Sequence, residues 1–195
     1  MIRLFDVLLS GLGIILLFPL FLVLYILIRC ESSGEGFYVQ ERIGKDGKPF
    51  MMYKFRSMFE GADNGSKITI GSHDNRITRV GSFIRKYKLD ELPQLWNVFI
   101  GDMSIVGPRP EVEKYTRLYT SEQSKVLSVR PGITDWASIE YVDENIILGK
   151  ATDPDKTYIE IILPDKIRYN MKWIENQGVM EYFKIILMTF LKIIR

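Results

Sequence analysis

One uncharged apolar segment constrains most strongly how this chain can fold. From Val7 to Ile28 the sequence reads VLLSGLGIILLFPLFLVLYILI, 22 residues without a charged side chain. A continuous helix of that length reaches about 33 Å, enough to cross the hydrocarbon core of a bilayer. We therefore predict a membrane-inserted helix in residues 1–30 and one compact domain in residues 31–195.

Whether this helix spans the bilayer or turns back is a separate question. Pro19 lies in the middle of the run, where it removes a backbone hydrogen bond, so we expect a kink there. Length alone favours a span, and Arg3 and Arg29 flank the run symmetrically, so charge does not set an orientation. A cleaved signal peptide is the alternative, but the run is too long for its apolar region and the flank IRCESSGEG has no A-x-A site.

Composition excludes several classes of function. The net charge is +2 and is evenly spread along the chain, which argues against nucleic-acid binding. The single cysteine, Cys30, permits no intrachain disulfide, and the single histidine, His73, supplies neither a typical zinc site nor a Ser-His-Asp triad. Any catalysis must therefore rest on carboxylates and on metals that prefer oxygen ligands.

The domain is predicted to be α+β and mainly helical. FYVQERIG and KPFMMYKFRSM are strand-like segments joined by Lys45-Asp46-Gly47, which predicts a β-hairpin. Lys54 and Arg56 are two residues apart and are expected on one face of its second strand. The sequence EGADNGSK at 60–67 predicts a mobile loop before a helical segment from Ser82.

The last segment, 179–195, predicts a helix that lies in the membrane interface. On a helical wheel one face is polar and the rest apolar, and the polar side chains are Glu181, Lys184, Thr189, Lys192 and Arg195. A wide apolar face with basic polar residues suits the headgroup region. The alternative is a core helix of a soluble domain.

Residues 88–111 contain the densest chemical signal. Asp90 is a good N-cap residue and Pro93 is tolerated in a first turn, so we predict a helix starting at the pair Asp90-Glu91. The pair then either caps the helix and complements its dipole, or binds a magnesium ion. Nearby cations that suit phosphate favour the second interpretation, and they are Arg85, Lys86, Lys88 and Arg109.

Two further loops contain an arginine beside proline and glycine. Gly107-Pro108-Arg109-Pro110 predicts a rigid loop in which Arg109 presents its guanidinium to a phosphate. The segment 129–134 contains Arg130 and a Pro-Gly turn that is equally consistent with a purely architectural role. The sequence has no P-loop, G-x-G-x-x-G or H-E-x-x-H motif.

Taken in order, the motifs resemble those of the bacterial sugar transferases, the monotopic phosphoglycosyl transferases. The resemblance covers residues 1–137 closely. Its motifs are Arg3…Phe5-Asp6, Tyr53-Lys54-Phe55-Arg56-Ser57-Met58, Asp74-Asn75-Arg76-Ile77-Thr78, Leu89-Asp90-Glu91-Leu92-Pro93-Gln94-Leu95, Gly101-Asp102-Met103-Ser104, Val106-Gly107-Pro108-Arg109-Pro110 and Arg130-Pro131-Gly132-Ile133-Thr134.

This resemblance implies a reaction. A UDP-sugar would give its sugar phosphate to undecaprenyl phosphate and release UMP, the first membrane step of polysaccharide, O-antigen or glycoprotein glycan assembly. Asp90 would be the nucleophile and form a phosphosugar-aspartyl intermediate, while Glu91, with Asp90, would hold Mg²⁺. The phosphate-binding residues would be Arg109 first, then Lys54, Arg56 and Arg85.

The resemblance also implies a location at the cytoplasmic face of the bacterial inner membrane. The family's membrane helix is re-entrant and breaks at a Ser-Pro pair, so both of its ends lie on the cytoplasmic side. Here Phe18 precedes Pro19, so the serine hydroxyl is missing. The chain also departs from the family at Asp135, where many members have glycine, and at Ser138-Ile139-Glu140.

The sugar, the exact polyprenol and the oligomeric state are not predicted, although a homo-oligomer is compatible with the sequence. Tyr141, Asp143 and Glu144 either face the sugar or belong to a solvated loop. Two other functions remain as alternatives. Asp153-Pro154-Asp155 resembles the D-x-D motif of a nucleotide-sugar glycosyltransferase, and the apolar helices also suit a non-enzymatic membrane scaffold.

Overall fold

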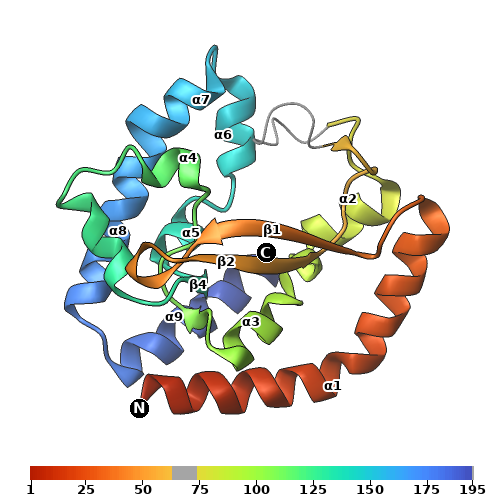
Figure 1. Cartoon of the computed structure of the whole chain (residues 1–195), viewed down its shortest axis with the longest axis horizontal. Coiled ribbons are helices and arrows are strands. Elements are labelled where there is room, and N and C mark those ends of the chain that lie inside the picture. Colours follow the sequence, from red (N-terminus) through yellow and green to blue (C-terminus); the bar gives the residue numbers. More distant parts are fainter. Residues whose placement is uncertain (63–73, 195) are drawn as a thin grey trace.

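The computed structural model describes residues 1–62 and 74–194, which form a mainly helical α+β fold as predicted. His73 and most of the predicted loop at 60–67 lie outside the described residues. The elements, in order (Figure 1), are α1 (Ile2–Glu31), β1 (Phe37–Ile43), η1 (Lys45–Gly47), β2 (Pro49–Phe55), α2 (Arg79–Lys86), η3 (Leu89–Glu91), α3 (Gln94–Ile100), β3 (Ser104–Val106), α4 (Glu113–Thr116), η4 (Gln123–Ser128), β4 (Gly132–Thr134), α5 (Trp136–Glu140), α6 (Glu144–Lys150), α7 (Pro154–Thr157), η5 (Tyr158–Ile162), α8 (Leu163–Glu175) and α9 (Val179–Ile194).

Helix α1 contains the predicted apolar segment and bends into two limbs (Figure 1). Pro19 lies inside the helix, and a proline there removes a backbone hydrogen bond and causes kinks. Among the described residues, α1 is the one helix long and apolar enough to cross a membrane, and little of it is buried. Its exposed apolar side chains include Leu12, Ile15 and Leu16.

Both limbs of α1 pack on the rest of the domain. In the first limb, the Arg3 guanidinium donates to the carbonyl oxygens of Val98 at 2.6 Å and Phe99 at 3.0 Å, at the end of α3. In the second limb, Leu24 and Ile28 are buried with Phe55 of β2 and other apolar side chains. The domain therefore contacts α1 on both sides of its bend.

Hydrogen bonds from polar side chains join the end of α1 to the neighbouring elements. The Glu31 carboxylate accepts hydrogen bonds from the backbone N–H groups of Arg79 at 2.8 Å and Val80 at 2.9 Å, which are the first two residues of α2. The Arg56 guanidinium donates to the carbonyl oxygen of Ser32 at 2.8 Å and also to that of Ser33. These contacts join the end of α1 to both β2 and α2.

The predicted hairpin is confirmed. Strands β1 and β2 pair antiparallel from Phe37 opposite Phe55 to Ile43 opposite Pro49. The connector η1 contains Asp46 with φ 57°, in the left-handed region, which reverses the chain. Helix α2 begins three residues before the predicted Ser82, because the Thr78 hydroxyl caps it by accepting from the Gly81 N–H at 2.8 Å.

A second, parallel pair of short strands brings the two arginine-containing loops together. Ser104 of β3 pairs with Gly132 of β4, and Val106 pairs with Thr134. A Cβ on Gly132 would lie 2.1 Å from the Gly107 nitrogen, so only glycine fits this close approach of two backbones. The Pro-Gly pair at the start of β4 therefore has a structural role, and Arg130 donates to the Gly101 carbonyl oxygen at 2.8 Å.

Helix α9 matches the predicted segment at 179–195 but is not a simple interfacial helix. Tyr182 and Ile185 are fully buried in the core, whereas Leu187, Phe190 and Leu191 are exposed. Part of the predicted polar face contacts protein: Glu181 accepts from Trp136 Nε1 at 2.8 Å, and the hydroxyls of Thr189 and Thr134 lie 2.7 Å apart. One side of α9 is thus core, and an apolar surface remains exposed.

Asp6 in α1 anchors three elements. Its Oδ1 accepts from the Ser104 hydroxyl at 2.9 Å, the Ile105 N–H at 3.0 Å and the Tyr182 hydroxyl at 2.9 Å, and the residue is 2% exposed. Hydrogen bonds to a buried charged group are among the stronger ones in proteins. Asp6 therefore joins α1 to β3 and to α9.

We expect Asp6→Ala to lower the free energy of unfolding by about 3 kcal/mol or more, because three donors, two of them in buried hydrogen bonds, lose their acceptor. Tyr182→Phe removes one of these donors and should cost about 1 kcal/mol. Tyr87→Phe, at an exposed site, serves as the control. Denaturant unfolding of the protein in detergent measures all three, and an Asp6→Ala variant as stable as wild type would contradict the anchor.

Candidate active site

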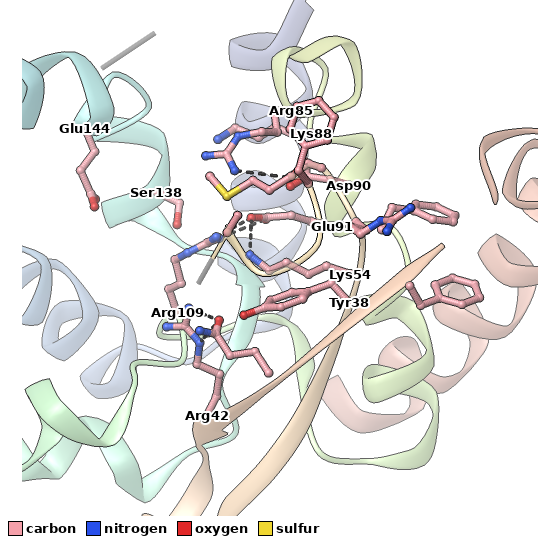
Figure 2. Close-up of a pocket in the computed structure, with 18 of the residues that line it drawn as sticks. Tyr38, Arg42, Lys54, Arg85, Lys88, Asp90, Glu91, Arg109, Ser138 and Glu144 are labelled. Atoms are coloured by element: carbon pink, nitrogen blue, oxygen red, sulfur yellow. Dashed lines mark hydrogen bonds and ion pairs between the residues drawn. The ribbon is translucent and has the colours of Figure 1, made fainter. Parts of the chain in front are cut away.

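A polar cavity of about 560 Å³ opens between the hairpin, η3 and the segments that follow β3 and β4. Among the described residues, seven basic and five acidic side chains line it, so its lining is net positive and suits an anionic ligand. Figure 2 shows Asp90 and Glu91 amid the cations. The seven basic side chains are Arg42, Lys54, Arg56, Arg85, Lys88, Arg109 and Lys166.

Glu91 is held by two cations from distant parts of the chain. Its Oε2 accepts from Arg109 Nη1 at 3.0 Å, its Oε1 accepts from Arg109 Nη2, and Lys54 Nζ lies 3.3 Å from the same Oε1. Burial alone would raise the pKa of Glu91, but Arg109 and Lys54 outweigh it and hold that pKa well below its usual range. Glu91 is therefore ionised and fixed in place.

Asp90 lies beside Glu91 in a very different state. It is 8% exposed, and its Oδ1 is buried without a hydrogen-bond partner among the described residues. Burial raises the pKa of Asp90, and the Glu91 charge adds to the effect. The adjacent carboxylates thus differ sharply: one is neutralised by ion pairs, and the other is available to a ligand.

The prediction that a helix starts at this pair is wrong. Lys88 adopts φ 56°, in the left-handed region, and Leu89–Glu91 then forms a separate short 3₁₀ turn without a side-chain cap. Helix α3 begins later, at Gln94, directly after Pro93. Asp90 therefore lies inside a turn rather than ahead of a helix, and the capping interpretation of this residue no longer applies.

Arg109 is positioned through its backbone as well as its side chain. The Asp135 carboxylate, which is fully buried, accepts from the Arg109 N–H at 3.3 Å and from the Ser138 N–H at 2.6 Å. Asp135 thereby caps α5 and joins it to the loop of Arg109. The sequence showed Asp135 only as a departure from the family pattern, although an aspartate just before a helix is a recognisable cap signal.

The other predicted phosphate ligands occupy different positions. Arg85 lines the cavity and donates to the Ser57 hydroxyl at 3.3 Å, and Lys54 lines it beside Glu91. Arg56 also lines the cavity, but its Nη atoms donate to carbonyl oxygens at the end of α1. Arg56 therefore binds the end of α1, and its contact with phosphate remains a prediction.

The D-x-D alternative finds no counterpart in the geometry. Asp153 caps α7 by accepting from the Lys156 N–H at 3.0 Å. The Asp155 carboxylate accepts from Lys114 Nζ at 2.5 Å and from the Tyr115 hydroxyl at 2.9 Å. Neither aspartate lines the cavity. Both carboxylates are therefore explained by local structure.

Two cations of the cavity were missed in the sequence. Arg42 donates to the Pro110 carbonyl oxygen at 3.2 Å, next to Arg109. Lys166 Nζ lies 3.0 Å from Glu144 Oε2, and the nearby Tyr158 hydroxyl donates to Glu111 at 2.5 Å outside the cavity lining. No local pattern marks Arg42 and Lys166, because they come from β1 and α8 and reach the site only in the folded chain.

The carboxylate pair fits a magnesium ion in part. Mg²⁺ in proteins commonly takes one or two carboxylate oxygens together with substrate phosphates and waters. The unpartnered Asp90 Oδ1 suits this role, whereas both oxygens of Glu91 already accept from cations. Among the described residues, no group of three His, Cys, Asp or Glu side chains gathers to form a closed metal site. Any Mg²⁺ here depends on the substrate for further ligands.

The bent apolar helix is long and apolar enough to enter a membrane, and the cation-lined cavity has a charge that suits an anionic ligand. The whole chain, residues 1–195, matches the family model described as bacterial sugar transferase. The chain therefore belongs to the bacterial sugar transferase family.

Named relatives agree with this assignment. A putative undecaprenyl-phosphate N-acetylgalactosaminyl 1-phosphate transferase of Bacillus subtilis is 44% identical over 120 residues, which cover 62% of this chain and 67% of that protein. The UDP-N-acetylgalactosamine-undecaprenyl-phosphate N-acetylgalactosaminephosphotransferase of Aeromonas hydrophila is 38% identical over 88% of this chain. The UDP-glucose:undecaprenyl-phosphate glucose-1-phosphate transferase of Klebsiella pneumoniae is 36% identical over 97% of it. The matched regions cover 38% and 39% of the last two proteins, so this chain spans well under half of their length.

We expect Asp90→Asn to stabilise the folded protein increasingly as pH rises. In the unfolded chain the carboxyl ionises near its ordinary pKa of 3.8, whereas burial raises that pKa in the folded protein. The folded wild type therefore loses stability relative to the variant as pH increases above about 4. Thermal unfolding between pH 4 and 7, without added metal, measures the difference in Tm.

The matched control is Asp143→Asn, at an exposed position outside the cavity. Its difference in Tm from wild type should stay constant across the same pH range. A stabilisation by Asp90→Asn that shrinks as pH rises would show that the Asp90 carboxylate has a stabilising partner.

Proposed function

We propose that this protein transfers a sugar phosphate from a UDP-sugar to undecaprenyl phosphate and releases UMP. The observation that supports it best is the buried, unpartnered Asp90 oxygen inside a net positive cavity. A nucleotide diphosphate needs such cations, and a nucleophilic carboxylate needs an oxygen that no protein donor holds. The names of the relatives point to the same reaction. The product would begin polysaccharide, O-antigen or glycoprotein glycan assembly.

In the first step, an Asp90 oxygen attacks the β-phosphorus of the donor. A new bond forms between that oxygen and phosphorus, the bond from phosphorus to the bridging oxygen breaks, and UMP leaves with the electron pair. In the second step, a phosphate oxygen of the lipid attacks the same phosphorus and expels the Asp90 carboxylate. The product is a polyprenyl-diphosphate sugar, and the carboxylate is regenerated.

The cations of the cavity neutralise the charge that builds up during these steps. Arg85 and Lys88 lie near Asp90 in Figure 2 and line the cavity with it. Arg109 retains N–H groups beyond those that contact Glu91, and its pKa is raised by the Glu91 charge, so it stays charged. Mg²⁺, when bound by Asp90 with a contribution from Glu91, would supply further positive charge to the diphosphate.

We further propose that α1 is re-entrant and that the protein lies at the cytoplasmic face of the bacterial inner membrane. The contacts of Arg3 and Glu31 support this topology, because they join the two limbs of α1 to one domain. A straight span would place these two residues on opposite sides of the bilayer. Exposed apolar side chains of α1 and α9 would lie in lipid, next to the substrate's polyprenyl chain.

Intact-protein mass spectrometry with Mg²⁺ and a panel of UDP-sugars, without lipid acceptor, tests the covalent step. We expect a sugar-phosphate adduct on wild type and on the control Asp143→Asn, and none on Asp90→Asn. With undecaprenyl phosphate present, the nucleotide product should be UMP. An adduct on Asp90→Asn would remove the nucleophile role, and release of UDP would indicate a glycosyltransferase.

Thiol labelling in bacteria tests the topology. Cys30 is exposed near the end of α1. An impermeant maleimide should label it only after the inner membrane is opened. A cysteine-containing tag fused ahead of Met1, in a Cys30→Ser background, should behave identically if α1 is re-entrant. If the tag is labelled from outside intact spheroplasts, while Cys30 in the untagged protein is not, α1 spans the membrane instead.

A further inference from the structure

The cavity has a side whose chemistry does not suit phosphate. Ser138 of α5 and Glu144 at the start of α6 line it across from Asp90 (Figure 2). Lys166 also lines this side and pairs with the Glu144 carboxylate, so little net positive charge is left here for a diphosphate and a neutral ligand group suits it better. Hydroxyl and carboxylate oxygens accept hydrogen bonds, and a neutral group rich in O–H donors complements them.

The Ser138 hydroxyl has unused hydrogen-bonding capacity. Its Oγ is buried and has no partner among the described residues. Its backbone is fixed, because the Ser138 N–H donates to the buried Asp135 carboxylate at 2.6 Å. Leaving such an atom unpartnered costs about 1 to 3 kcal/mol, so the hydroxyl needs a partner from outside the described residues, and at a cavity wall a ligand can supply it.

The Glu144 carboxylate is held in place rather than left in solvent. Lys166 Nζ donates to its Oε2 at 3.0 Å, and Lys166 is itself 5% exposed. The same ammonium group lies 3.5 Å from the Tyr158 hydroxyl, which donates to Glu111. A buried network therefore orients Glu144 at the cavity, as expected of a group that recognises a ligand.

Tyr141 and Asp143, which lie near Glu144 in the sequence, are less available to a ligand in the cavity. The Tyr141 hydroxyl donates to Asp165 at 2.7 Å, so that proton is already engaged. Asp143 does not line the cavity. Of the three residues that the sequence left open toward the sugar, Glu144 is therefore the one with an oriented acceptor in the cavity.

We propose that Ser138 and Glu144 bind hydroxyl groups of the hexose of the UDP-sugar and so determine which sugar is accepted. This inference rests on the proposed function. The hexose is bonded through one oxygen to the phosphorus that Asp90 attacks, whereas the ribose lies one phosphate further away. The hexose must therefore enter the same cavity as Asp90, and Ser138 and Glu144 offer acceptors there.

The test compares donors that differ at a single hydroxyl. The value of kcat/KM is measured for UDP-glucose against UDP-galactose, and for UDP-N-acetylglucosamine against UDP-N-acetylgalactosamine. Ser138→Ala and Glu144→Gln should change the preferred ratio by about ten- to hundredfold, mainly through KM, because a hydrogen bond to one sugar is lost. Inhibition by UMP should stay within about twofold of wild type, since UMP lacks the hexose.

Matched controls are Ser121→Ala and Glu140→Gln, at exposed positions that do not line the cavity. Their donor ratios should equal that of wild type. Unchanged ratios in both Ser138→Ala and Glu144→Gln, with wild-type Tm, would overturn the inference. Weaker UMP inhibition with unchanged donor ratios would also overturn it and would assign these residues to the nucleotide part of the donor.

Calorimetric binding of the same donors separates this inference from the proposed function. If wild type releases no UMP, the proposed function fails, but selective binding of one UDP-hexose and its loss in Ser138→Ala and Glu144→Gln would still support the hexose contacts. If wild type binds none of the UDP-hexoses, both proposals fall.

Discussion

The ion pairs of Glu91 hold together three segments that are far apart in the sequence. Lys54 comes from β2, Glu91 from η3, and Arg109 from the loop after β3. Removing one partner of a buried pair leaves an uncompensated charge, which costs several kcal/mol. The hairpin, η3 and the arginine loop are therefore constrained to one arrangement. Because Asp90 precedes Glu91 directly, the same ion pairs fix its position between these segments. Its Oδ1 has no hydrogen-bond partner among the described residues.

Polar contacts at several points join the rest of the domain to the apolar helix α1. Asp6 joins α1 to β3 and α9, Arg3 reaches the end of α3, and Glu31 caps the start of α2. Because β3 leads directly into the loop of Arg109, the position of α1 is coupled to that of the cavity. In the proposed reaction, one substrate is soluble and the other is embedded in lipid. This coupling would keep the cavity at a defined distance from the bilayer surface.

Local patterns predicted the elements that depend on neighbouring residues. The apolar run of α1 and the alternating strands around Lys45-Asp46-Gly47 were confirmed. The helix start at Asp90 was predicted wrongly, because the left-handed Lys88 produces a separate turn that its sequence does not reveal. Arg42 and Lys166 were missed because no spacing in the chain relates them to Asp90. Their positions follow from packing of β1 and α8 around the cavity.

The sequence by itself determined the family, the long apolar helix, the hairpin and the chemical types present at the site. These follow from composition, periodicity and motif order, which are properties of the chain in any conformation. Only the tertiary structure decided which carboxylate is paired and which is free, that Arg56 holds the end of α1, and that Ser138 and Glu144 share a cavity with Asp90. The physical reason is that pairing and burial depend on distances between segments that meet only when the chain folds.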